Sequence, residues 1–72
     1  MNSNEEDIIK ALIKIREEQG ISQRQLAALT GIKQPAIARL ESGRSAPNIT
    51  TLKKLLAPLG YTLTISHISN QT

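Results

Sequence analysis

Four glycines divide the first 60 residues of this chain into short segments, and this spacing constrains the fold more than any other feature. Within each segment, apolar residues recur three or four positions apart, which is the period of one face of an α-helix. Glycine adopts the left-handed conformation that ends many helices without steric cost. The four glycines are Gly20, Gly31, Gly43 and Gly60. The pattern predicts four helices, over residues 5–19, 23–30, 34–42 and 49–57.

The composition fits a small all-α bundle. The chain has 72 residues, which allows one domain at most. Isoleucine and leucine together account for 19 of these residues, enough apolar side chains for a core. Valine, phenylalanine and tryptophan are missing, and Tyr61 is the only aromatic residue. This composition therefore argues against folds built mainly from strands.

The same composition argues against several functions. Without cysteine, the chain has neither a disulfide framework nor a thiolate metal site. No apolar run approaches the roughly 18 residues of a membrane span, and the polar residues 2–7 are not a signal peptide. His67 is the only histidine, and its position on an expected strand favours a structural role over a catalytic or metal-binding one. We expect a cytoplasmic protein with no enzyme activity, metal, cofactor or membrane partner.

The last segment changes its period. Bulky and small polar residues alternate over 61–68, which is typical of a half-buried strand. A lone strand leaves backbone groups unpaired, and its simplest partner is the same strand of a second copy. We therefore predict a homodimer in which Tyr61, Leu63 and Ile65 face the helices; a disordered or helix-docked tail is the alternative. The expected organisation is a helical domain over 1–60, a dimerisation strand over 61–68 and a tail over 69–72.

Positive charge is concentrated in the middle of the chain. Residues 1–22 carry a net charge of −2, residues 23–54 carry +5 and residues 55–72 carry none. A basic stretch on a small domain indicates a polyanionic partner such as nucleic acid. Charge alone leaves a solvated surface as the alternative.

Two short helices joined by a glycine-containing turn form a candidate helix-turn-helix motif. Ser22 and Gln25 have the spacing of a capping box at the start of the first motif helix. Ala27 is small enough to let the second motif helix cross closely, and Gly31 supplies the positive φ that the turn requires. An ordinary helical hairpin is the alternative.

The outward face of the second motif helix suits the major groove of DNA. If Ile37 and Leu40 point inward, the helical period places small residues and one arginine on the opposite side. Arginine can read guanine bidentately, and the N-terminal end of such a helix usually points at base edges. A solvated surface arginine is the alternative for Arg39 alone. The outward residues are Pro35, Ala38, Arg39 and Ser42, with Lys33 and Gln34 at the N-terminal end.

Two charged residues fall on inward helical faces. Arg16 lies within the apolar stripe of the first helix, and Glu41 lies beside Ile37 on the inner side of the third. A lone buried charge costs several kcal/mol, so each needs a partner. We predict that Arg16 and Glu41 pair and fix the first helix against the third. The alternative is that both charged groups reach outward to solvent.

A set of residues spread over the first four predicted segments matches one known family. On this set, residues 8–59 resemble the phage repressor/Cro helix-turn-helix family, also called the XRE family. The matching residues are Leu12, Arg16, the run ISQRQLAALTGI at 21–32, Ile37, the run LESGR at 40–44, Pro47, Leu52 and Leu55.

The resemblance implies a dimer that binds operator DNA with the second motif helix in the major groove. The family's buried arginine–glutamate pair falls on Arg16 and Glu41. Residues at or near base edges would be Lys33, Gln34, Ala38 and Arg39. Residues at phosphates would be Gln23, Arg24, Arg44 and the backbone at Ser42 and Gly43.

The chain departs from this family in two places. Pro35 occupies a position that is often a polar base reader, so one base contact is in doubt. The fifth helix common in the family is replaced by the expected strand. This ending is similar to HigA/HipB-type antitoxins, in which a terminal strand helps the protein to dimerise.

Two principal functions follow from these observations. The first is a sequence-specific repressor that binds a palindromic operator as a homodimer. The second is an antitoxin that binds a toxin protein and represses its own operon with the same motif. A purely structural interaction module is a third possibility, and it would require that the second motif helix not face solvent. The regulated gene and the operator sequence do not follow from the residues.

Overall fold

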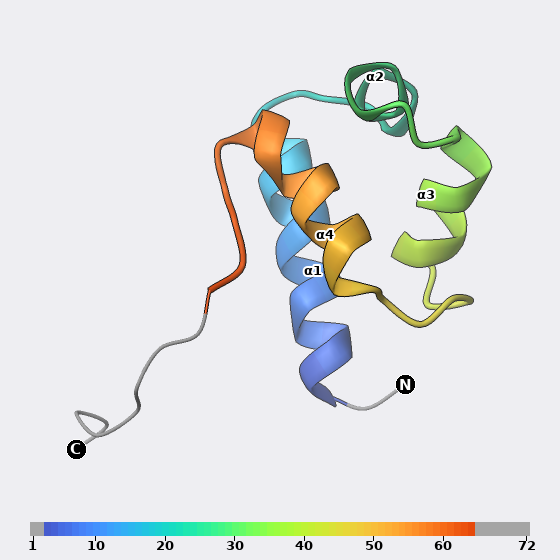
Figure 1. The fold of residues 1–72 in the computed structure, drawn as a ribbon, viewed down its shortest axis with the longest axis vertical. Helices are drawn as coiled ribbons and strands as arrows, with labels where there is room; N and C mark the ends of the chain where they lie inside the picture. The colour runs from blue at the N-terminus through green and yellow to red at the C-terminus, as the bar shows by residue number, and fades with distance from the viewer. Residues whose placement is uncertain (1–2, 65–72) are drawn as a thin grey trace.

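The computed structural model describes residues 3–64 and confirms a small all-α bundle (Figure 1). The described part contains four α-helices, one 3₁₀ turn and no strand. None of its helices is long and apolar enough to cross a membrane. The elements are α1 (Ser3–Glu18), α2 (Gln23–Thr30), α3 (Gln34–Glu41), α4 (Ile49–Leu56) and η1 (Ala57–Leu59).

Side-chain hydrogen bonds cap the starts of α2 and α4. At α2, the Ser22 hydroxyl accepts a hydrogen bond from the Gln25 amide at 3.0 Å, and the Gln25 side chain accepts one from the Ser22 amide at 2.7 Å. This reciprocal pair is the predicted capping box. At α4, the Asn48 side chain accepts from the Thr51 amide at 3.2 Å. Pro35 lies in the first turn of α3, where no intrahelical N–H is required.

The helix ends differ from the predicted ones by one or two residues. Helix α1 begins at Ser3 and ends at Glu18. The chain leaves the α4 geometry at Ala57 and tightens into η1, which contains Pro58. A tight last turn of this kind satisfies carbonyl groups that an α-helix would leave without partners. The Gly60 amide donates to the Ala57 carbonyl at 3.0 Å, and Gly60 has a φ of 87°.

All five elements supply side chains to a single core. The short helices α2 and α3 depend on this packing, because eight residues are too few for a helix that is stable in water. Helix α2 is anchored by Leu26, which has no exposed surface. Helix α3 packs against both α1 and α2. The buried residues are Ile9, Leu12, Leu26, Ile37, Leu40, Leu52, Leu55, Leu56 and Leu59.

The described part of the predicted strand has no regular structure. Residues 61–64 run along the molecule after η1 (Figure 1), and residues 3–64 offer them no partner strand. Leu63 packs against the core as expected, whereas Tyr61 keeps 51% of its surface exposed. Ile65 and the rest of the 61–68 segment lie outside the described residues.

Candidate nucleic-acid interface

Helices α2 and α3 form a helix-turn-helix with a three-residue turn. Gly31 ends α2 with a φ of 77°, and its amide donates to the Ala27 carbonyl at 2.9 Å. The Thr30 hydroxyl donates to the Leu26 carbonyl at 2.8 Å and accepts from the Ile32 amide at 3.2 Å. These bonds fix the direction in which the chain enters α3.

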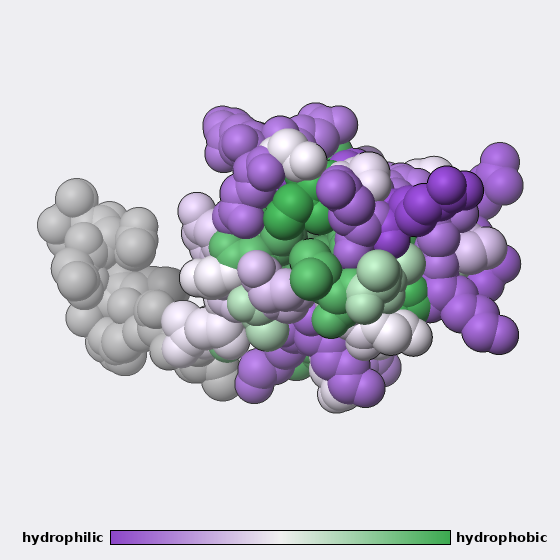
Figure 2. Space-filling view, turned by 90° about the horizontal axis from the view of Figure 1, so that it is seen from above, coloured by the Kyte–Doolittle hydropathy of each residue, from purple (hydrophilic) through white to green (hydrophobic). Residues whose placement is uncertain are grey.

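The predicted outward face of α3 is open. Ile37 and Leu40 are buried, Ala38 is half-buried, and the remaining outward side chains are exposed. Helix α3 lies at one edge of the molecule (Figure 1), and hydrophilic side chains cover this end in the view from above (Figure 2). Helix α3 thus presents a narrow, polar face with small residues, which is available to a groove of DNA. The exposed residues at this face are Lys33, Gln34, Pro35, Arg39 and Ser42.

The cations of the basic segment are all exposed, whereas its acid is not. The carboxylate of Glu41, the only acidic residue within 23–54, is 5% exposed and is neutralised by Arg16. No exposed acidic residue within 23–54 therefore offsets the positive charge of its exposed cations. The exposed cations are Arg24, Lys33, Arg39, Arg44, Lys53 and Lys54.

The structure brings together the two inward charges singled out in the sequence. Arg16 Nε donates to Glu41 Oε2 at 2.8 Å, and Arg16 Nη2 donates to Glu41 Oε1 at 2.8 Å. A third bond runs from Arg16 Nη1 to the Ile21 carbonyl at 2.8 Å. Hydrogen bonding to the Glu41 carboxylate raises the pKa of Arg16 despite its burial. The pair ties α1 to α3 and to the loop before α2.

The ion pair continues into two glutamines that sequence reasoning did not connect. Gln23 Nε2 donates to Glu41 Oε1 at 2.9 Å, and Gln34 Nε2 donates to Gln23 Oε1 at 2.9 Å. Gln23 opens α2 and Gln34 opens α3, and these positions were the only sequence signal for the contact. The predicted phosphate contact of Gln23 therefore competes with two bonds inside the chain, because its amide keeps only one further hydrogen.

The turn after α3 contains the backbone predicted to lie at phosphates. In the free chain, the amides of Ser42 and Gly43 donate to the Ala38 and Leu40 carbonyls at 3.0 and 3.1 Å. They close the end of the helix because its last carbonyls need donors. The Ser42 hydroxyl donates to the Arg39 carbonyl at 3.1 Å. The exposed Arg44 side chain is the group at this turn best suited to a phosphate.

The comparisons with known proteins agree with this geometry. A model of a helix-turn-helix family matches residues 12–66. The chain belongs to this family. It is 59% identical over 58 residues to an uncharacterized HTH-type transcriptional regulator of Haemophilus influenzae, and 44% identical over 54 residues to the HTH-type transcriptional regulator PuuR of Escherichia coli. These matches cover 81% and 75% of the chain, but only 59% and 29% of the two regulators.

A solved structure is also similar to this chain. The chain matches a toxin–antitoxin module from Streptococcus pneumoniae with a TM-score of 0.70 and 44% sequence identity. The match covers 85% of this chain and 68% of that one. The chain thus resembles HTH-type transcriptional regulators in sequence and a chain of a toxin–antitoxin module in structure.

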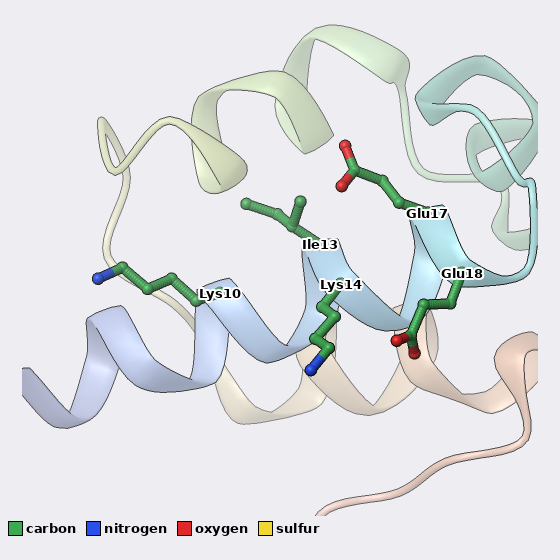
Figure 3. Close-up of a pocket in the computed structure, with 5 residues that line it drawn as sticks. All are labelled: Lys10, Ile13, Lys14, Glu17 and Glu18. Carbon is green, nitrogen blue, oxygen red and sulfur yellow. The ribbon is translucent and has the colours of Figure 1, made fainter.

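A shallow depression on α1 lies outside the helix-turn-helix formed by α2 and α3. Its walls are four charged side chains of mixed sign around Ile13, which points toward α3 (Figure 3). Residues 3–64 contain no group of three or more histidine, cysteine, aspartate or glutamate side chains that could hold a metal ion. The helix-turn-helix remains the candidate site. The charged residues of the depression are Lys10, Lys14, Glu17 and Glu18.

Proposed function

We propose that this helix-turn-helix protein is a repressor that binds a palindromic operator as a homodimer, with α3 in the major groove. The observation that carries the proposal is the open face of α3, which presents Arg39 and small side chains above the buried Ile37 and Leu40. The turn at Gly31 supports the proposal because it joins α2 to α3 in the short helix-turn-helix arrangement. Such a regulator would act in the cytoplasm and would need no cofactor.

The side chains divide into two roles in this proposal. Arg39 can read guanine, and Gln34 can read adenine, because each side chain matches the edge of its base with two hydrogen bonds. Lys33 and Ala38 would lie beside them at the base edges. Positively charged groups at the ends of the motif helices would hold phosphates and so set the register on the duplex. These groups are Arg24 and Arg44, with Gln23 supplying its remaining amide hydrogen.

A second copy would complete the interface. Two α3 helices on one side of B-DNA must lie about 34 Å apart to enter successive major grooves. Pairing of the 61–68 segments across a two-fold axis would set this distance. Support comes from Leu63, which fixes the start of this segment on the core, and from Tyr61, which leaves apolar surface exposed there. Ile65 would continue the same face.

An antitoxin role is the second candidate. It is favoured by the 44% identity to a chain of a toxin–antitoxin module. In this case the protein would bind a toxin protein and use the same α3 face to repress its own operon. Co-purification with the product of a small neighbouring reading frame would separate this role from that of a simple repressor.

Substitution of two arginines tests the DNA-binding proposal. We expect Arg39→Ala to cost about 1–3 kcal/mol on the best operator and to relax the preference at one base pair per half-site. Arg44→Ala should weaken binding to all sequences about equally, because phosphate contacts carry no direct sequence information. Selection of bound sites from random DNA defines the operator, and competition with single-base variants then measures each preference. Equal losses on every sequence for both variants would contradict this assignment.

Removal of residues 65–72 tests the dimer. A chain ending at Thr64 keeps Leu63 on the core but loses half of the proposed strand. We expect this chain to sediment as a monomer at micromolar concentration and to keep the helical circular dichroism of the full chain. It should also lose cooperative binding to the palindrome. A truncated chain that sediments as the same dimer as the full chain would place the interface elsewhere.

A further inference from the structure

The side-chain amide of Gln23 lies between the buried ion pair and the first residue of α3. Its nitrogen donates to Glu41 Oε1 and its oxygen accepts from Gln34 Nε2, both at 2.9 Å. Gln23 is half-buried, whereas Gln34 is exposed at the face proposed to meet DNA. Neither base reading nor phosphate binding accounts for the bond to Glu41.

The Glu41 carboxylate determines the orientation of the Gln23 side-chain amide. A carboxylate paired with arginine is ionised and can only accept hydrogen bonds. Gln23 must therefore turn its nitrogen toward Glu41 and its oxygen toward Gln34. Gln34 must then turn its own nitrogen toward Gln23, since two amide oxygens would repel each other. One ionised carboxylate thus fixes the orientation of both amides.

Glu41 is itself rigidly held. Two hydrogen bonds from Arg16 fix its carboxylate, and Arg16 is fixed by a third bond to the Ile21 carbonyl. Arg16 is 8% exposed and the Glu41 side chain 5%, so water competes little for these bonds. Charge-assisted bonds of this kind are stronger than neutral ones and hold their geometry. A continuous path of hydrogen bonds thus runs from Arg16 on α1 through Glu41 and Gln23 to Gln34, the first residue of α3.

We propose that Glu41 is a positioning residue for sequence recognition. By holding the Gln23 nitrogen, it fixes which edge of the Gln34 amide carries the donor and which the acceptor, and it thereby determines the base pair that Gln34 selects. The proposal rests on the proposed function, because Gln34 must lie against DNA for this order to matter. Glu41 itself touches no base.

The double variant Arg16→Met/Glu41→Leu tests the proposal. It removes one positive and one negative charge, so the net charge and the electrostatic attraction to DNA stay the same. Replacement of a buried ion pair by apolar residues of similar volume often preserves the fold. We expect selectivity at the base pair read by Gln34 to fall about tenfold. Non-specific binding and selectivity at the base pair read by Arg39 should be unchanged.

Gln34→Ala provides the matched comparison. In the wild-type background it should reduce selectivity at the same base pair by about tenfold. In the double-variant background it should change little, because the Gln34 amide has already lost its fixed orientation. If the double variant is folded and keeps wild-type selectivity at this base pair, Glu41 does not position Gln34. Should the double variant fail to fold, Gln23→Met keeps the ion pair, breaks the same link and should show the same loss.

Hydrogen exchange in the free protein gives a second test, which requires no DNA. In a proton–nitrogen correlation spectrum, the side-chain amide of Gln23 should exchange with solvent at least tenfold more slowly than that of Gln25. Gln25 is the internal reference because its side chain is exposed and bonds through its oxygen. Equal exchange rates would overturn the proposal. If the Gln23 amide exchanges slowly but the protein binds no DNA, the proposed function is refuted. If the double variant binds DNA with unchanged selectivity, only the role of Glu41 is refuted.

Discussion

Replacement of Glu41 by alanine should lower the free energy of unfolding by about 3–5 kcal/mol. The variant leaves the Arg16 guanidinium at a position that is 8% exposed, without the carboxylate that accepts two of its hydrogen bonds. Arg16 stays charged because its pKa lies far above neutral pH. It must then lose much of its hydration without a counter-charge, and it keeps only the Ile21 carbonyl as a partner.

Urea denaturation followed by circular dichroism measures this loss. The double replacement Arg16→Met/Glu41→Leu should recover much of it, because neither charge then remains buried. Recovery should be incomplete, since the Ile21 carbonyl loses its donor. Glu18→Ala is the control on α1: this exposed residue should change the stability by less than about 0.5 kcal/mol. A Glu41→Ala variant as stable as the Glu18→Ala control would mean that the ion pair contributes nothing.

The helices and the ion pair were predictable because both follow from local periodicity. Ser22 and Gln25 mark the start of α2, Gly31 marks its end, and the helical period places Arg16 and Glu41 on inward faces. A charge in an apolar stripe requires a partner, and the chain offers few inward charges to choose from. Pairing therefore followed from residue type and helical angle together.

The link through Gln23 was not predictable in the same way. Glutamine is neutral and often exposed, so its position at the start of α2 creates no unsatisfied charge that demands a partner. Its contact with Gln34 depends on the crossing of α2 and α3, which tertiary packing sets. The bonds that the Ser42 and Gly43 amides make within the end of α3 were not predictable for a related reason. Backbone donors near a helix end can serve either the helix or a ligand, and the residue types do not distinguish the two.

The 61–68 segment shows a different limit of prediction from sequence. The alternation over 61–68 specifies which side chains share a face, but a strand forms only when another strand supplies its hydrogen bonds. Within the described residues of one chain, Leu63 finds the core and Tyr61 stays half-exposed. The alternation of one sequence thus predicts the face of a strand but does not identify its partner.

Operator binding should weaken steeply with salt, with a slope of log K against log[salt] of about −5 to −7. Each protomer offers three or four exposed cations around the motif helices, so a dimer would displace about six to eight counterions from DNA. Arg16 does not contribute, because its charge is held by Glu41. Between about 50 and about 200 mM salt, affinity should fall by roughly three to four orders of magnitude. The contributing residues are Arg24, Lys33, Arg39 and Arg44.

Single substitutions assign this slope to particular residues. Arg44→Ala should reduce its magnitude by about 2, because a dimer loses two phosphate contacts at about 0.9 each. Lys53→Ala removes the same charge from α4, beside Leu63 and away from the motif helices, and should leave the slope unchanged. A slope near −3 for the wild-type chain would indicate binding by a single protomer and contradict the dimer. A slope near zero would contradict DNA binding altogether, because displacement of counterions from the phosphate backbone cannot be avoided when a basic surface meets DNA.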